Sequence, residues 1–302
     1  KSKIAFCGYH GWHDWYLAAN LQDSSKLNDH LLSGLEPLGV PKELAGTAVP
    51  FLFNNCEELE KIAKQNTNQL AAIVLEPIRN EEPTEEFKKM LLHVKQLTGA
   101  VIIIDEISAG FRLNAGGAHL NLGYEPDMAV FSKALGNGHP VGAIIGKSSV
   151  MNIAKDCFIS STYWTERVGY VAALATIRKY IECDVSTHLV KIGDSVQSCW
   201  KNAAKKTNLN ISVSGISPLS HFSFNYEDPL LIKAYFVQLM LERGILSSNL
   251  FYSMYSHDMT MIDTYSKAVE ESFKLIKQGI DNKNLESLIK GKRSNSGFIR
   301  LN

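Results

Sequence analysis

The fold is decided by two consecutive segments, VIIIDEISAGFR (residues 101–112) and GYEPDMAVFSKALGNGHPVGAIIGK (residues 123–147). In the first, an apolar run that predicts a buried strand ends in two carboxylates, Asp105 and Glu106. In the second, the apolar run Met128–Phe131 leads to a single lysine, Lys133, in a glycine-rich turn. A carboxylate and a lysine are therefore expected at the ends of two buried strands, along one edge of a sheet.

Outward from these segments, apolar runs alternate with amphipathic helices. Strands apolar on both faces, in alternation with such helices, predict an α/β fold whose mostly parallel central sheet has helices on both faces. Ligands of such sheets bind beyond the carboxyl ends of the strands, where Glu76, Asp105 and Lys133 are expected. The further strands are predicted at Lys3–Cys7, Leu70–Leu75 and 143–145, and the helices at Cys56–Gln65 and after an N-cap at Thr84.

The second half of the chain has a different pattern. A long helix is predicted from Glu166, and two short alternating runs, at 210–215 and 219–225, favour a small antiparallel sheet among further helices. We therefore predict a large α/β domain at residues 1–165, followed by a linking helix and a small C-terminal α+β domain at residues 166–302. Residues 21–50, which show no sustained period, are predicted to be a surface excursion.

Composition excludes several classes of function. The 302 residues include 31 Lys and Arg and 31 Asp and Glu, so no net field attracts nucleic acid or an anionic membrane. No apolar run reaches the roughly 18 residues of a membrane span, and no GxGxxG turn follows a strand, which excludes a dinucleotide-binding dehydrogenase. The five cysteines never form a CxxC pair, so we expect reduced thiols, a cytoplasmic protein and no metal site. Because the chain lacks an initiator Met and starts directly on a strand, we expect the front of the natural chain to be missing.

Asp105 and Lys133 each have an ordinary structural explanation. The aspartate would cap a helix or pair with Arg112, and the lysine would be a solvated strand end. However, the two lie 28 residues apart, about one βαβ unit, which would place them on neighbouring or near-neighbouring strands facing one crevice. One chemistry requires both: a lysine forms a Schiff base with pyridoxal phosphate (PLP), and an aspartate keeps the pyridine nitrogen of that cofactor protonated.

The motifs D-E-x-x-x-G-F-R, G-x-x-P-D and F-S-K-A-L-G-x-G-x-P-V-G-A, at residues 105–112, 123–127 and 131–143, resemble the class III aminotransferases of PLP fold type I. Within that family the sequence is most similar to the glutamate-1-semialdehyde 2,1-aminomutase group. Tyr9–His10–Gly11 and Glu76–Pro77 match further family landmarks in the right order. The resemblance implies a PLP-dependent transaminase that acts on small amine and carbonyl substrates. An intramolecular aminomutase and a non-catalytic relative that keeps the fold are the alternatives.

The resemblance also implies roles for individual residues. Lys133 would be the Schiff-base lysine and the group that moves the proton, and Asp105 would bond the pyridine nitrogen. Tyr9 would stack on the cofactor ring, with His10 beside it. Ser108 occupies the place from which relatives contact the 3-oxygen of the ring.

Part of the cofactor pocket is expected outside these residues. Thr162 matches the threonine that reaches the phosphate of the neighbouring subunit, which implies a homodimer with active sites at the interface. The glycine- and hydroxyl-rich phosphate cup of the family would lie upstream of Lys1. After Thr162 the chain reads YWTERVG, where many relatives have a glycine-rich turn with Asn-Pro, and this difference leaves the substrate open.

Overall fold

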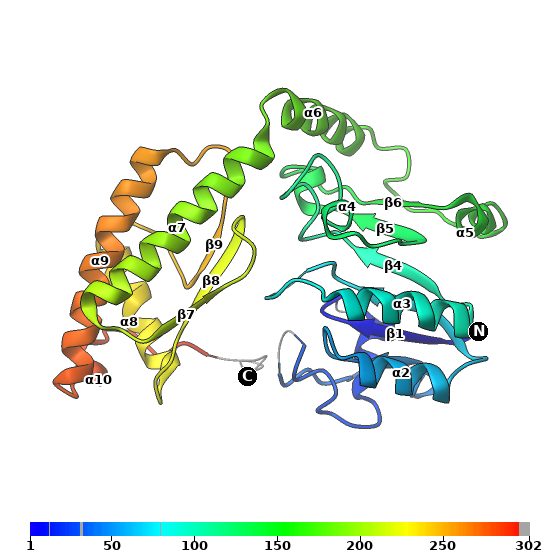
Figure 1. Ribbon diagram of the computed structural model, residues 1–302, viewed down its shortest axis with the longest axis horizontal. Coiled ribbons are helices and arrows are strands. Elements are labelled where there is room, and N and C mark those ends of the chain that lie inside the picture. Colours follow the sequence, from blue (N-terminus) through cyan, green and yellow to red (C-terminus); the bar gives the residue numbers. More distant parts are fainter. Residues whose placement is uncertain (12, 31–32, 79, 296–302) are drawn as a thin grey trace. The chain divides into compact units, whose positions relative to one another are not determined.

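The structure is a computed structural model that describes residues 1–11, 13–30, 33–78 and 80–295. The chain divides into two compact units (Figure 1). The first holds the described residues up to Glu182, apart from 80–81, and the second begins at Cys183. The predicted domain boundary after residue 165 stays a prediction. In the described part of the chain, no helix has both the length and the apolar character that crossing a membrane requires.

The first unit is built on a sheet in which the described residues form six strands, in the order β2-β1-β3-β4-β5-β6. All neighbouring pairs are parallel except β5 and β6, which are antiparallel. The predicted α/β fold with a mostly parallel sheet is therefore confirmed. The strands are β1 (Lys3–Cys7), β2 (Ala48–Pro50), β3 (Leu70–Leu75), β4 (Val101–Asp105), β5 (Met128–Phe131) and β6 (Ala143–Gly146).

Side chains alternate between the two faces of this sheet. Helices α2 (Cys56–Gln65) and α3 (Glu85–Thr98) lie side by side over one face (Figure 1), where they bury Ile73 and Leu75 of β3. Val74 points to the opposite face, into a smaller core that holds helix α1 (Asp14–Leu17) and the 3-10 helix η1 (Ala18–Asn20). The remaining short helices of this unit are η2 (Lys42–Leu44), α4 (His119–Leu122), η3 (Lys133–Leu135), α5 (Ser148–Met151) and η4 (Asn152–Asp156), and the long helix is α6 (Val168–Glu182).

Side-chain caps start α2 and α3 where the sequence indicates. The Thr84 hydroxyl accepts the Phe87 N–H at 3.1 Å, which confirms the predicted cap, and Asn55 accepts the Glu58 N–H at 3.1 Å. Each helix also has acidic residues in its first turn, as the helix dipole favours. Local hydrogen bonds therefore fix the first turns of these two helices, which form the layer that packs on β1, β3 and β4.

The prediction for residues 21–50 was wrong in one respect. Its described residues form no long helix or strand, as expected, but the segment is not simply a surface excursion. Leu27, Leu35 and Val40 are buried, and Leu27 and Leu35 pack in the same core as Phe6. These residues reach the core one at a time from irregular chain, so no periodic pattern marks them.

The second unit packs helices against a small antiparallel sheet in the order β7-β8-β9. Helices α7 and α9 lie side by side (Figure 1) and bury Trp200, Phe222, Phe236 and Phe273 in one aromatic core. The two predicted alternating runs are confirmed as β7 and β8, whereas β9 was not predicted. The elements are α7 (Val185–Thr207), β7 (Ile211–Ser214), β8 (Leu219–Phe224), α8 (Pro229–Glu242), β9 (Leu250–Tyr252), α9 (Met259–Asp281) and α10 (Leu285–Leu288).

Candidate active site

The carboxyl ends of β1, β3, β4 and β5 lie at one edge of the first unit's sheet, because these four strands are parallel. We call this the carboxyl edge. Strands β4 and β5 are direct neighbours, with Asp105 opposite Val130, as the spacing of Asp105 and Lys133 predicted. Five of the six predicted site residues lie at or just after these strand ends, namely Tyr9, His10, Asp105, Ser108 and Lys133.

Asp105 is held as one half of a buried pair with His10. Its Oδ2 lies 2.8 Å from Nδ1 of His10, and its Oδ1 accepts the Ile107 N–H at 3.0 Å. The side chains of His10 and Asp105 are only 3% and 10% exposed. Nε2 of His10 lies 3.0 Å from the carbonyl oxygen of Cys7, which can only accept, so Nε2 carries a proton. The other ring nitrogen, Nδ1, faces the carboxylate, so the ring of His10 bridges the Cys7 carbonyl and Asp105.

Aromatic rings fix the orientation of His10. Its ring is stacked on Trp15 at 6.3 Å between centroids, and Phe6 meets it edge-on at 6.1 Å. Tyr16 also contacts it edge-on, and the hydroxyl of Tyr16 donates to the Gly8 carbonyl at 3.2 Å. A histidine ring held in this way presents the same nitrogen to Asp105 at all times. The sequence motif placed His10 beside the cofactor, whereas the structure makes it a partner of Asp105.

Tyr9 lies next to His10 and is anchored through its backbone. Its N–H donates to Oε2 of Glu76 at 3.4 Å, and burial raises the pKa of its phenol, which therefore stays neutral near pH 7. Glu76 comes so close to the chain here that a Cβ on Gly8, whose φ is +110°, would lie 2.5 Å from the same oxygen. The glycine thus lets the end of β1 approach the acid that follows β3.

Lys133 follows β5 in a tight and strained turn. Its φ is +45°, a left-handed value that is unusual for a residue with a side chain. The turn is held by the Ser132 hydroxyl, which donates to the Val141 carbonyl at 2.8 Å, and by Gly136, where a Cβ would lie 2.1 Å from the His139 carbonyl. The surrounding loop therefore imposes the direction in which Lys133 leaves the strand.

The amine of Lys133 has a hydroxyl as its partner. Its Nζ donates to Oγ of Ser108 at 2.6 Å, across the β4–β5 pair. Within the described residues, no carboxylate forms an ion pair with Lys133. The structure thus pairs Asp105 with His10 and Lys133 with Ser108. Asp105 and Lys133 do not form an ion pair with each other.

Glu106 has a structural task that the sequence did not reveal. It is fully buried and its carboxylate accepts N–H groups of Ala118 and His119 at 2.9 and 2.8 Å, as well as Nδ1 of His119 at 2.7 Å. A Cβ on Gly117 would lie 2.3 Å from that nitrogen. Glu106 therefore ties the loop before α4 under the strand end that carries Asp105. Only the Asp-Glu pair in the sequence pointed to it.

Thr162 lies exposed in a turn before α6, and no hydrogen bond joins it to the other five predicted residues, all of which the structure describes. Glu166, four residues later, accepts the N–H groups of Val168 and Gly169 at 2.6 and 3.2 Å. It therefore caps the start of α6. The start of α6 packs on the lysine turn, since a Cβ on Gly169 would lie 3.0 Å from Val141.

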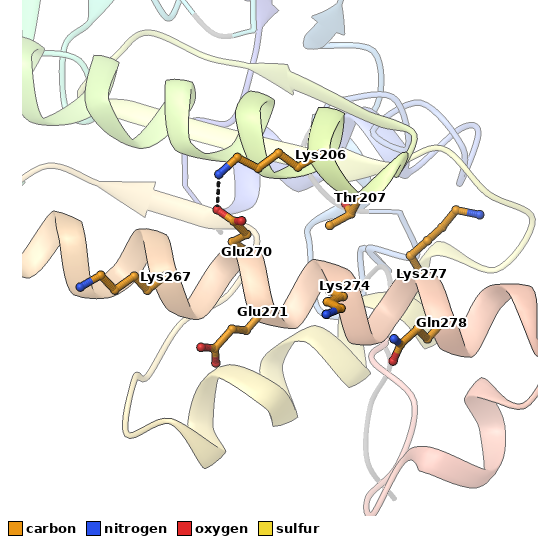
Figure 2. A pocket seen from close by; sticks show the side chains of 8 residues that line it. All are labelled: Lys206, Thr207, Lys267, Glu270, Glu271, Lys274, Lys277 and Gln278. Carbon is orange, nitrogen blue, oxygen red and sulfur yellow. Dashed lines mark hydrogen bonds and ion pairs between the residues drawn. The ribbon is translucent and has the colours of Figure 1, made fainter.

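A separate surface hollow lies in the second unit, between α7 and α9. It has a volume of about 560 Å³ and is lined by charged side chains (Figure 2), among them Lys206, which donates to Glu270 at 2.7 Å. None of the six predicted site residues lines it. The described residues also contain no group of three His, Cys, Asp or Glu side chains placed to hold a metal ion.

The family pattern described as "Aminotransferase class-III" matches residues 4–251. The chain belongs to the class III aminotransferases. The match spans the whole of the carboxyl edge and most of the second unit. It confirms the family predicted from the motifs around Asp105 and Lys133.

Curated relatives of this class III aminotransferase chain have several activities. This chain is 28% identical over 273 residues to the 3-aminobutyryl-CoA aminotransferase of Cloacimonas acidaminovorans, and the match covers 85% of this chain and 59% of the relative. It is 36% identical over 188 residues to the glutamate-1-semialdehyde 2,1-aminomutase of Ignicoccus hospitalis, covering 59% and 43%. With the 2'-deamino-2'-hydroxyneamine transaminase of Streptomyces kanamyceticus the identity is 26%, covering 89% and 65%. The chain thus spans less than two thirds of the length of these three relatives.

Solved structures share the fold of this chain. The FumI protein of Sphingopyxis sp. MTA144, in its PLP internal aldimine form, superposes with a TM-score of 0.81 at 20% identity, over 96% of this chain and 68% of that one. An omega-transaminase from Sphaerobacter thermophilus superposes with a TM-score of 0.78 at 22% identity, over 92% and 69%. At these identities the similarity shows the fold alone, and it agrees with the predicted fold type I.

The carboxyl edge fits the ring of PLP, the cofactor of this family. Each oxygen of the Asp105 carboxylate has one hydrogen-bond partner and a further lone pair that a pyridine N–H could use. Lys133 presents an exposed amine, and Tyr9 presents a neutral aromatic ring. The phosphate needs hydrogen-bond donors that these three residues do not offer, so the fit concerns the ring and its aldehyde.

Proposed function

We propose that this chain carries the amine-transfer centre of a PLP-dependent aminotransferase, which moves an amino group between an amine and a carbonyl compound. One observation carries the proposal. On neighbouring strands, the carboxyl edge presents a carboxylate held by His10, namely Asp105, and an amine that no carboxylate of the described residues pairs with, namely Lys133. When bound, the cofactor supplies an electron-withdrawing ring that spreads the negative charge left when a proton leaves the substrate carbon.

Each residue of the carboxyl edge has a task in this proposal. Asp105 would accept a hydrogen bond from the pyridine nitrogen and favour its protonated form, while His10 holds the Asp105 side chain in place. Lys133 holds the cofactor through its Nζ. When Nζ is not bonded to the cofactor, it would remove the proton from the α-carbon of the amine substrate and later give a proton back as the product forms. Tyr9 packs its ring against the cofactor, and Ser108 is placed for the 3-oxygen.

An intramolecular aminomutase is the second candidate. The glutamate-1-semialdehyde 2,1-aminomutases among the relatives, from Ignicoccus hospitalis and Caldicellulosiruptor saccharolyticus, favour it. In that reaction the same residues act, but the first product stays bound and receives the amino group on its neighbouring carbon. A transaminase consumes a separate carbonyl acceptor, whereas an aminomutase needs none, and this requirement separates the two.

We also propose that the active form is a homodimer in which Thr162 reaches the cofactor phosphate of the partner subunit. The exposed apolar residues of β6 and α6 support this. Ile144 and Ile145 are 56% and 55% exposed, and Val171 and Leu174 of α6 are 64% and 55% exposed. Surfaces of this kind mark interfaces. Thr162→Ala should weaken PLP affinity about tenfold, which equilibrium titration of the cofactor would measure, and an unchanged affinity would contradict the contact.

The domain division and the location of the protein follow from the same proposal. The α/β domain predicted at residues 1–165 would bind the cofactor, and residues 166–302 would form the linking helix and small domain. None of the five cysteines, all of which lie in the described residues, forms a disulfide, which agrees with the reducing cytoplasm that we propose as the location.

Half-reactions test the proposed activity. PLP added to the purified chain should give the visible absorbance of a lysine-bound cofactor, and a suitable amine should then remove that absorbance. Screening amino acids and amino sugars one at a time would identify the donor class. If no visible absorbance develops, the chain is a non-catalytic relative that keeps the fold.

A further inference from the structure

The hydrogen bond between Lys133 and Ser108 joins two elements that are each held rigidly. Ser108 lies in the turn after β4, which is closed by the Ile107 N–H on Asp105 at 3.0 Å and by the Gly110 N–H on the Glu106 carbonyl at 2.7 Å. The Ser108 hydroxyl is one bond from Cβ, so it has little freedom to move. The strained turn of Lys133 supplies the other half of the contact.

A hydroxyl differs from a carboxylate as a partner for a lysine. A carboxylate within 4 Å favours the charged ammonium form, which has no lone pair for bond formation. A hydroxyl accepts a bond from the ammonium form and can also rotate to donate to the neutral amine, because it has one proton and two lone pairs. Ser108 therefore holds Nζ in either state, at the 2.6 Å distance seen here.

We propose that Ser108 is a positioning residue for Lys133, one that keeps the free amine aimed along the carboxyl edge whenever it is not bonded to a cofactor. The use of this contact in amine transfer rests on the proposed function, whereas the contact itself does not. Without the hydroxyl, the long side chain of Lys133, which is exposed, would sample many rotamers. With it, the amine waits at one place between the strand ends.

The first test uses the full-length chain freed of cofactor and measures how fast Lys133 reacts with trace amounts of acetic anhydride. Mass spectrometry of the peptides gives the labelling of Lys133 relative to that of Lys267, an exposed lysine on α9 (Figure 2). Ser108→Ala should release the amine and raise this ratio about threefold to tenfold, the size expected for one lost hydrogen bond. Ser108→Thr keeps a hydroxyl and should stay within twofold of the wild type.

Ser195→Ala is the matched control, because the Ser195 hydroxyl donates to the Lys191 carbonyl on the surface of α7. It should leave the ratio unchanged. An equal ratio in Ser108→Ala and the wild type would overturn the proposal, and so would a Thr variant that behaves like the Ala variant. Should Ser108→Ala not fold, Ser108→Cys provides the same comparison with a side chain of similar size and a weaker hydrogen-bonding group.

The second test follows the rate of PLP capture by visible absorbance. Ser108→Ala should slow capture about threefold to tenfold, while the Thr variant should restore it. A partly unfolded variant is not expected to show both faster labelling of Lys133 and slower capture of PLP. A wild-type chain that captures no PLP would disprove the proposed function, and the labelling ratio would still decide the role of Ser108.

Discussion

Strands β4 and β5 have acids and lysines near both of their ends, but the contacts at the two ends differ. At the amino edge, Asp127 precedes β5 and accepts bonds from the Nζ of Lys95, the Nζ of Lys147 at 3.2 Å and the Ile102 N–H at 2.9 Å. Burial acts to raise the pKa of Asp127, but the bonds from Lys95, Ile102 and Lys147 outweigh it and hold that pKa below its usual value. The carboxylate of Asp127 is therefore occupied by two lysines and a backbone N–H.

At the carboxyl edge, the acid and the lysine have different partners. Asp105 pairs with the ring of His10, while Lys133 bonds the neutral Ser108. The charges at the amino edge therefore join α3, β4, β5 and Lys147, the residue after β6. In the part of the chain that the structure describes, the carboxyl edge instead has one carboxylate that a histidine holds and one amine that pairs with no carboxylate. This separation is what covalent amine chemistry requires.

Replacing the lysine at each edge should give the largest contrast. Lys133→Ala removes the group that we propose holds the cofactor and carries the proton, so amine transfer should fall by on the order of 10⁴-fold or more. Lys147→Ala, the matched variant at the amino edge, should keep most of its activity. Steady-state rates with saturating PLP would measure both. Normal visible absorbance and turnover in Lys133→Ala would break the comparison.

Replacing Asp105 should have the next largest effect. Asp105→Ala should still capture PLP on Lys133, yet lose amine transfer by about 10²- to 10³-fold, because the ring nitrogen loses its acceptor. The contrast of retained absorbance with lost turnover is the informative readout. Near-normal rates would mean that Asp105 is a structural acid like Asp127.

Replacing His10 should have a smaller effect. His10→Asn keeps a donor toward Asp105 but loses the ring that Trp15 and Phe6 hold in place, so turnover should fall about tenfold. Steady-state rates with saturating PLP would measure the loss. Wild-type turnover in His10→Asn would show that the ring of His10 does not help to position Asp105.

The amino edge should affect stability alone, and only slightly. Lys147→Met should lower the free energy of unfolding by about 0.5 kcal/mol, because the side chain of Lys147 is half exposed. Since the pKa of Asp127 is lowered in the folded chain, its ion pairs stabilise fully above the unfolded value of about 4 and are lost as the pH falls below it. Urea unfolding should show a difference at pH 6 that disappears near pH 2; a difference that persists at pH 2 would contradict this assignment.

Much of the first unit could be predicted from the sequence because its signals are local. Helix α2 has the predicted bounds, and α3 begins after the predicted cap at Thr84. The continuous apolar runs predicted β1, β3 and β5, and both faces of β1 and β3 are covered by layers of the same unit. Patterns of this kind need only neighbouring residues to be read.

Features that depend on distant residues could not be read in the same way. The direction of β6 was one, although the 11 residues between Phe131 and Ala143 leave no room for the helical crossover of a parallel pair. Strand β9 has only three residues and carries no periodic signal. Leu27 and Leu35 enter the core from irregular chain, which hides them from any period.

The residues of the candidate site were predicted from motifs, but their pairing was not. His10 and Asp105 are 95 positions apart, and Ser108 and Lys133 are 25 apart. Their meeting depends on the order of strands in the sheet, which the sequence does not state. The roles assigned to these residues, and to Thr162, stay predictions until they are tested by substitution.

The most direct test of the central claim is to locate the lysine that binds the cofactor. The chain would be incubated with PLP, reduced with borohydride and digested, and mass spectrometry would identify the modified peptide. The account predicts that the cofactor is fixed to Lys133. Modification of Lys147 or another lysine in its place, or no modification at all, would contradict it.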